Sequence, residues 1–130
     1  MKRVVFLLTI IMLSMSSCSK GPSPEGPTDI RIKNLSDQTF ESLSVDTSGG
    51  TNEYDAVAAG GYSDYKRFDK AYPKAEISVM IGGEIYSTGE QIYNYQVVLG
   101  QGKFTYEVFI ENAALKKLAI SKVIPEAPLD

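Results

Sequence analysis

Cys18 is the only cysteine in this 130-residue chain, and its thiol is the most distinctive reactive group in the sequence. It follows a basic pair, Lys2-Arg3, and an apolar run from Val4 to Met15 that is well short of the roughly 20 residues needed to span a bilayer. A single cysteine forms no intramolecular disulfide, so packing alone must stabilise the fold.

The segment that ends at this cysteine resembles the signal peptide of bacterial lipoproteins. Met15-Ser16-Ser17-Cys18 is similar to the lipobox of that class, with Met in place of the usual Leu. The resemblance implies a signal peptide over residues 1–17 and a mature chain that begins at Cys18. Acyl chains such as palmitate on that cysteine would anchor the protein, since several chains together hold firmly in a bilayer. An ordinary secretory signal with an unrelated cysteine is the alternative.

Residues 18–27 are rich in Pro, Gly and Ser and read as a tether between the lipid and a folded domain. Ten such residues reach at most roughly 33 Å. By resemblance to Gram-negative lipoproteins, Ser19 after the cysteine implies sorting through the cell envelope to the outer membrane. Glu25 is the only acid of this segment, so the acidic run of some surface-exported lipoproteins is missing. The choice between the periplasmic and the surface leaflet stays open.

Enzymatic and metal chemistry have weak support in the sequence. The chain has no histidine, which removes the commonest general base and zinc ligand. Nothing in the spacing sets two carboxylates across a cleft, as a glycosidase requires; the candidates are Asp64, Asp69, Glu84 and Glu90. The loop from residue 46 to residue 55 is rich in oxygen ligands but matches no EF-hand spacing; its candidate calcium ligands are Asp46, Asn52, Glu53 and Asp55. We therefore expect that the protein is not an enzyme and that it binds neither a cofactor nor a metal ion.

A strip of aromatic and basic residues is the best candidate for a binding surface. It comprises Tyr62, Tyr65, Lys66, Arg67 and Tyr72. Tyrosine offers rigid contact area at low entropic cost, so such a strip could stack a sugar ring or a peptide. The alternative is that the rings are half-buried along strands with their hydroxyls in water.

The elements that must position these residues are strands. From Thr28 onward, apolar residues alternate over short stretches that Gly, Asn, Asp and Ser interrupt every eight to twelve residues, a pattern typical of an antiparallel β-sandwich or barrel. The predicted strands cover residues 30–33, 43–45, 54–59, 62–68, 75–81, 84–87, 95–99, 104–110 and 117–123. Gly82-Gly83 suits a tight hairpin, and Pro125 and Pro128 should end the last strand. We therefore expect one domain over residues 28–124 and a tail over 125–130.

A second resemblance concerns the domain itself. The run from Val98 to Val108, VLGQGKFTYEV, resembles the end segment of prealbumin-like sandwich modules of bacterial cell-surface proteins. With Gly61-Tyr62-Ser63-Asp64-Tyr65, the chain is similar to small Gram-negative lipoproteins that carry one such domain and mostly have no assigned function. The resemblance implies an all-β, antiparallel sandwich of about seven to eight strands, immunoglobulin-like or transthyretin-like.

The net charge of the chain limits the classes of molecule that it could bind. Residues 1–17 hold two of the 13 basic side chains and none of the 16 acidic ones, so their removal changes the net charge from −3 to −5. An acidic chain with scattered basic residues is not expected to bind nucleic acid. The sequence thus predicts a non-enzymatic, membrane-anchored envelope protein that binds a protein or glycan ligand. A structural accessory subunit of an outer-membrane or surface assembly is the alternative.

Overall fold

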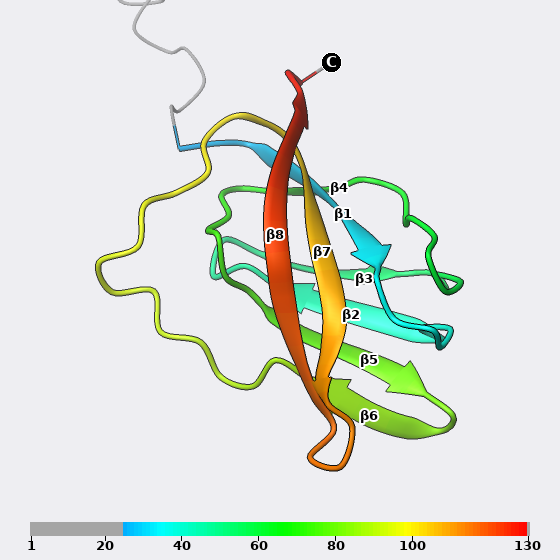
Figure 1. Cartoon of the computed structure of the whole chain (residues 1–130). Coiled ribbons are helices and arrows are strands. Elements are labelled where there is room, and N and C mark those ends of the chain that lie inside the picture. The colour runs from blue at the N-terminus through cyan, green and yellow to red at the C-terminus, as the bar shows by residue number, and fades with distance from the viewer. Residues whose placement is uncertain (1–24, 130) are drawn as a thin grey trace, which may run out of the picture.

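A computed structural model describes residues 25–129, which form an all-β domain without a helix (Figure 1). The all-β prediction is therefore confirmed. Its strands are β1 (Thr28–Asn34), β2 (Ser42–Asp46), β3 (Thr51–Tyr54), β4 (Lys66–Phe68), β5 (Glu76–Ile81), β6 (Glu84–Ser87), β7 (Gly102–Asn112) and β8 (Lys117–Ala127). Across these residues no helix has the length and hydrophobicity of a membrane span. The predicted signal peptide and Cys18 lie outside the described residues.

The eight strands form one mixed sheet in the order β3-β2-β5-β6-β8-β7-β1-β4. Most neighbours are antiparallel, but β1 pairs with β7 in parallel from Thr28↔Gly102 to Asn34↔Val108. Strands β6 and β8 are also parallel, joined at Ser87↔Lys117. The sheet therefore departs from the purely antiparallel arrangement that we expected. Alternation along a strand sets which face is buried, but it does not set the direction of the neighbouring strand.

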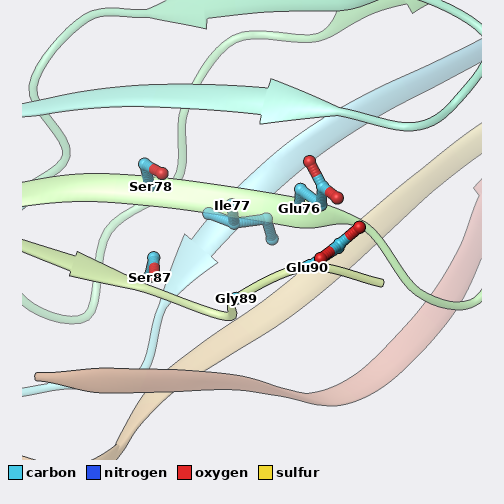
Figure 2. Close-up of a pocket in the computed structure, with 6 residues that line it drawn as sticks. All are labelled: Glu76, Ile77, Ser78, Ser87, Gly89 and Glu90. Carbon is cyan, nitrogen blue, oxygen red and sulfur yellow. The ribbon is translucent and has the colours of Figure 1, made fainter. Parts of the chain in front are cut away.

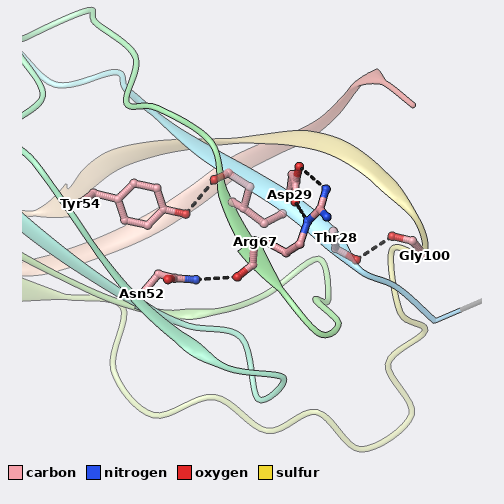
Figure 3. Close-up of polar contacts among 7 residues, drawn as sticks. Thr28, Asp29, Asn52, Tyr54, Arg67 and Gly100 are labelled. Carbon is pink, nitrogen blue, oxygen red and sulfur yellow. Dashed lines mark hydrogen bonds and ion pairs between the residues drawn. The ribbon is translucent and has the colours of Figure 1, made fainter. Parts of the chain in front are cut away.

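The sheet curves until it is nearly a barrel. In Figure 1, β7 and β8 cross in front of β2 and β5. The two edge strands, β3 and β4, then meet, and the side-chain amide of Asn52 donates a 2.8 Å hydrogen bond to the carbonyl oxygen of Arg67 (Figure 3). This near-closure shields both sheet edges, which would otherwise be open to pairing with another chain.

The core fills the space between the two halves of the curved sheet. Alternate residues of the strands point inward and are buried; they include Ile30, Ile32, Leu43, Val45, Ile77, Val79, Tyr106, Val108 and Leu118. Two core tyrosines keep their hydroxyls hydrogen-bonded: Tyr54 donates to the Ile30 carbonyl at 2.7 Å (Figure 3), and Tyr106 to the Tyr72 carbonyl at 2.5 Å. Burying these rings therefore leaves no hydroxyl unsatisfied.

Four segments differ from the strand predictions. Strand β3 covers Thr51–Tyr54 instead of residues 54–59, and β4 covers only Lys66–Phe68 of the expected 62–68. The strand expected over residues 95–99 is part of a loop, 88–101, because Tyr95 has a φ of 65° and leaves the extended region. Strand β8 continues through Pro125 to Ala127 instead of ending before the proline. Pro125 lies beside a bulge in the β7–β8 ladder, and β6 pairs with β8 only at Lys117, so the missing N–H costs little.

Candidate functional site

Tyr62 is held alongside β1 by main-chain and side-chain hydrogen bonds. Gly60, with a φ of 74°, turns the chain so that Tyr62 forms an antiparallel bridge with Lys33. The Ser63 N–H donates to the Ile32 carbonyl at 2.8 Å, and the Ile32 N–H donates to the Ser63 hydroxyl oxygen at 2.8 Å. Residues paired across an antiparallel bridge point to the same face, so Tyr62 lies on the outer face of β1.

Three cationic side chains surround Tyr62 and Tyr65 there. The Arg31 guanidinium carbon is 4.1 Å from the Tyr62 ring centre and 5.0 Å from that of Tyr65. The ammonium of Lys33 is 5.1 Å from the Tyr62 ring centre, and that of Lys103 is 5.2 Å from the Tyr65 ring centre. Cation–π contacts of this kind are worth about 0.5–1 kcal/mol each at exposed sites. We call these five residues the tyrosine–cation surface.

Arg31 is itself fixed by neighbouring strands. The parallel register sets it opposite Thr105, whose hydroxyl oxygen accepts a 2.9 Å hydrogen bond from the Arg31 Nε. The Glu126 carboxylate lies 3.4 Å from the Arg31 Nη2 and accepts a 2.8 Å hydrogen bond from the Thr105 hydroxyl. The guanidinium under Tyr62 is therefore held in place, although the ring itself remains 50% exposed.

A small pocket adjoins the Tyr62 ring. It has a volume of about 150 Å³ and is lined by Tyr54, Asp55, Ala56, Tyr62, Ser63, Asp64 and Lys66. This is less than the roughly 300–1,000 Å³ of sites that enclose a whole small molecule. Its carboxylates accept hydrogen bonds and its ammonium group donates them, so the pocket matches the edge of a hydroxyl-bearing ring.

The structure brings together only three of the five residues predicted for the binding strip. Tyr62, Tyr65 and Lys66 lie at the tyrosine–cation surface or its pocket. Arg67 instead makes a two-pronged ion pair with Asp29, Nε to Oδ1 at 2.8 Å and Nη2 to Oδ2 at 3.1 Å (Figure 3). Tyr72 packs against Tyr93, with ring centres 4.9 Å apart, next to the 88–101 loop.

Sequence reasoning missed Arg31, Lys33 and Lys103. The alternation of Ile30-Arg31-Ile32-Lys33 already places Arg31 and Lys33 on the outer face of β1, so that signal was available. No sequence signal places Lys103 opposite Asp29, because this pairing joins segments more than 70 residues apart.

A second depression, of about 440 Å³, lies where β5 begins and β6 ends (Figure 2). It is lined by Glu76, Ile77, Ser78, Ser87, Gly89 and Glu90. Of the four acids considered for a glycosidase pair, it holds Glu90 alone, whose acidic neighbour is Glu76. The Glu76 carboxylate accepts a 3.2 Å hydrogen bond from the Gln91 N–H. Burial first, then the nearby Glu76 and Asp46 carboxylates, raise the pKa of Tyr93 to about 12.

The acids considered for calcium do not converge. In the β2–β3 hairpin Asp46 pairs with Thr51 beside the turn, whereas Asp55 follows the far end of β3. The Asp46 carboxylate instead accepts a 2.9 Å hydrogen bond from the Ser48 N–H. Within residues 25–129, no three His, Cys, Asp or Glu side chains gather where they could hold a metal ion.

Comparison with known proteins adds information on the fold alone. No protein-family model matches this chain, and no curated protein matches it. Among solved structures, the chain is similar to the NMR structure of a protein from Eubacterium rectale, with a TM-score of 0.53 and 13% sequence identity. The match covers 78% of this chain and 95% of the other. The arrangement of strands is therefore shared with that protein, and at this identity the likeness says nothing about a shared activity.

Proposed function

We propose that this protein is a non-enzymatic lipoprotein of the cell envelope whose all-β domain binds a glycan. Lipid on Cys18 attaches it to the outer membrane, and residues 18–27 tether the domain. The observation that carries the binding role is the half-exposed Tyr62 ring, supported by Arg31 and bordered by a small polar pocket.

The chemistry of this surface favours a glycan. An aromatic ring fixed from one side presents its remaining area to the apolar face of a sugar ring at little entropic cost. Asp55, Asp64 and Lys66 in the pocket supply acceptors and a donor for the hydroxyls at the edge of that sugar. A flat protein ligand would leave this pocket unfilled.

We extend the proposal to the finer fold class, an immunoglobulin-like or transthyretin-like sandwich. Its support is that β7 and β8 cross β2 and β5 in Figure 1, and that β1, β2, β5, β7 and β8 contribute to one shared core. The two parallel pairings of β1 with β7 and β6 with β8 are where this protein would depart from the antiparallel form.

The test is binding of the purified protein to an array of neutral and acidic oligosaccharides, with Tyr62→Ala as the variant. Losing a stacking ring should weaken binding about tenfold, which corresponds to roughly 1.4 kcal/mol. The matched control is Tyr95→Ala, because Tyr95 is fully exposed but lies outside the surface. Equal binding by wild type and Tyr62→Ala would reject the site, and no binding to any sugar by the folded wild type would reject the glycan.

A second candidate function, an accessory subunit of an envelope assembly, is favoured by a different observation. Ile85 and Leu115 are 62% and 73% exposed, and the Glu84–Lys116 ion pair, at 3.3 Å, joins the start of β6 to the β7–β8 turn. Exposed apolar side chains at one end suit contact with a protein partner. A complex from solubilised membranes that is lost in Leu115→Glu but kept in Tyr62→Ala would favour this candidate.

A further inference from the structure

We propose that the 88–101 loop is a membrane-contacting element that seats the domain on the bilayer. Its exposed apolar side chains, Ile92, Tyr95 and Val97, would enter the interfacial region of the lipid. The inference rests on the proposed lipid anchor at Cys18, because that anchor is what brings the domain to a membrane.

The loop displays apolar side chains outward in a way that the fold does not require. Ile92 and Val97 are 71% and 79% exposed, and Tyr95 is fully exposed. Three of the seven large hydrophobic residues found exposed in residues 25–129 therefore fall within six consecutive positions. A loop this long without secondary structure is uncommon in a compact domain and usually has a function.

Two other residues of the loop, Tyr93 and Leu99, fasten it to the rest of the domain. Tyr93 packs on Tyr72 and donates a 3.3 Å hydrogen bond to the Asp46 carbonyl. The Leu99 N–H donates to the Ala71 carbonyl at 2.8 Å. The loop is thus fastened near its middle and near its end, and its apolar side chains project from a supported backbone.

The loop also lies beside the point where the tether enters the domain. The Thr28 hydroxyl donates a 2.6 Å hydrogen bond to the Gly100 carbonyl (Figure 3), and the Gln101 side-chain amide donates to the Gly26 carbonyl at 3.1 Å. Only eight residue steps separate Gly26 from Cys18, which is at most about 29 Å of chain. Val97, three residues before Gly100, is therefore within reach of the membrane that holds the lipid.

The composition of the loop fits a lipid surface rather than a charged one. Glu90 is the only ionisable acid or base in residues 88–101 apart from its tyrosines. Aliphatic side chains with tyrosine are the mixture that partitions into a bilayer interface. The contact should therefore be apolar and insensitive to salt, since no basic side chain of the loop would attract anionic lipid.

This seating leaves the tyrosine–cation surface accessible. In Figure 1 the loop runs along one side of the molecule, whereas the segment between β3 and β4, which carries Tyr62, lies on the other side. A domain resting on the loop would present Tyr62 away from the membrane, toward a glycan.

The chain has no tryptophan, so Tyr95→Trp introduces a single reporter. The full-length gene is expressed, the membrane form is purified, and it is reconstituted in vesicles of phosphatidylethanolamine and phosphatidylglycerol, with or without phosphatidylcholine brominated on its acyl chains. We expect the indole emission to shift to shorter wavelength and to be quenched by the bromolipid, at low and at high salt. The matched control is Ile85→Trp, which reports from the β5–β6 hairpin at another end of the domain and should not be quenched.

An unquenched, solvent-like emission from Tyr95→Trp in membrane-bound protein would overturn the proposal. So would quenching that persists after Ile92→Asp and Val97→Asp are added, because the apolar contact would then not be its cause. A blue shift of Tyr95→Trp in the unlipidated Cys18→Ser protein, in solution without vesicles, would assign the loop to contact between two copies instead, and would also overturn it.

A separate measurement distinguishes failure of the proposed lipid anchor from failure of the loop contact. If the unaltered protein does not float with vesicles and Cys18 carries a free thiol, the proposed lipoprotein fails. Coupling that thiol to a maleimide-bearing lipid in the same vesicles still tests the loop. Quenching of Tyr95→Trp under this artificial tether would support the loop contact without the natural lipid, and absence of quenching would reject it.

Discussion

Tyr54 and Tyr106 place phenol hydroxyls inside an otherwise apolar core. Each donates a hydrogen bond to a main-chain carbonyl, of Ile30 and Tyr72 respectively. Burial is the main cause that raises the pKa of both side chains above the usual value for tyrosine, with smaller contributions from neighbouring groups. In both tyrosines the pKa is higher in the folded than in the unfolded state. The protonated side chains therefore stabilise the fold fully below about pH 10, and this contribution to the free energy of unfolding is lost as the pH rises further.

Tyr54→Phe isolates this effect. At pH 7 we expect a loss of about 1 kcal/mol in the free energy of unfolding, since the Ile30 carbonyl loses its partner. Above pH 10 the wild type should lose about 1.4 kcal/mol per pH unit more than the variant, so the two curves approach and then cross. Urea unfolding between pH 7 and pH 11 measures this, with Tyr95→Phe as the control for a solvent-exposed hydroxyl. Parallel curves throughout would contradict it.

At the scale of elements, the β2–β3 hairpin packs its main chain directly against the segment after β4. A Cβ on Gly49 would lie 2.4 Å from the Lys70 carbonyl oxygen and 2.8 Å from the Lys70 nitrogen. The Thr47 hydroxyl also donates to that carbonyl, at 2.8 Å. By contrast, Gly83 in the β5–β6 turn has a φ of 79° but open space around it. The two glycines are thus required for different reasons, one by contact and one by backbone conformation.

Gly49→Ala should therefore cost more than Gly83→Asn. Forcing a methyl group against main chain typically costs about 1–3 kcal/mol, whereas Asn tolerates a left-handed turn position at less than about 1 kcal/mol. Chemical denaturation of both variants gives the comparison. If Gly83→Asn were the more damaging change, backbone conformation would outweigh close packing in this fold.

On the scale of the whole molecule, the chain enters its sheet next to the tether. β1 starts at Thr28 and lies between β4 and β7, so the domain's N-terminal end is held inside the sheet. A lipid on Cys18 would then be joined by a short chain to a firmly paired strand, and the domain would stay close to its membrane. If the protein is anchored in the outer membrane and binds a glycan, as proposed, the side of that membrane that the domain occupies would decide which glycans it meets.

Cys18→Ser should move the protein from the membrane fraction to the soluble fraction without unfolding the domain, because the strands of the domain begin only at Thr28. Fractionation with a circular dichroism check tests this, and a variant that stays membrane-bound would contradict lipidation. Protease treatment of intact cells, with a periplasmic marker to report leakage, then tests on which side of the outer membrane the domain lies. Cleavage in intact cells would indicate the surface, and protection until the outer membrane is broken would indicate the periplasm.

Much of the local structure follows from the sequence by itself. The alternation of Ile30-Arg31-Ile32-Lys33 predicts a strand with one buried face, and Gly82-Gly83 predicts the β5–β6 hairpin; both are present. The lack of histidine likewise follows from the sequence alone, and it removes the commonest general base and zinc ligand. These features depend on side-chain type and on spacing within a few residues, so no partner strand is needed to read them.

Only the tertiary structure decided which segments meet. The parallel pairing of β1 with β7 and the bridge at Lys33↔Tyr62 bring Arg31, Tyr62 and Lys103 to one surface, while Arg67 turns to Asp29 and Tyr72 to Tyr93. The alternation over residues 95–99 predicted a strand, yet no ladder forms there and the loop exposes Tyr95 and Val97. Packing between residues distant in the chain determines which strands pair. The alternation of apolar and polar residues along a strand is the same whichever strand lies beside it, so the sequence pattern does not reveal the neighbour.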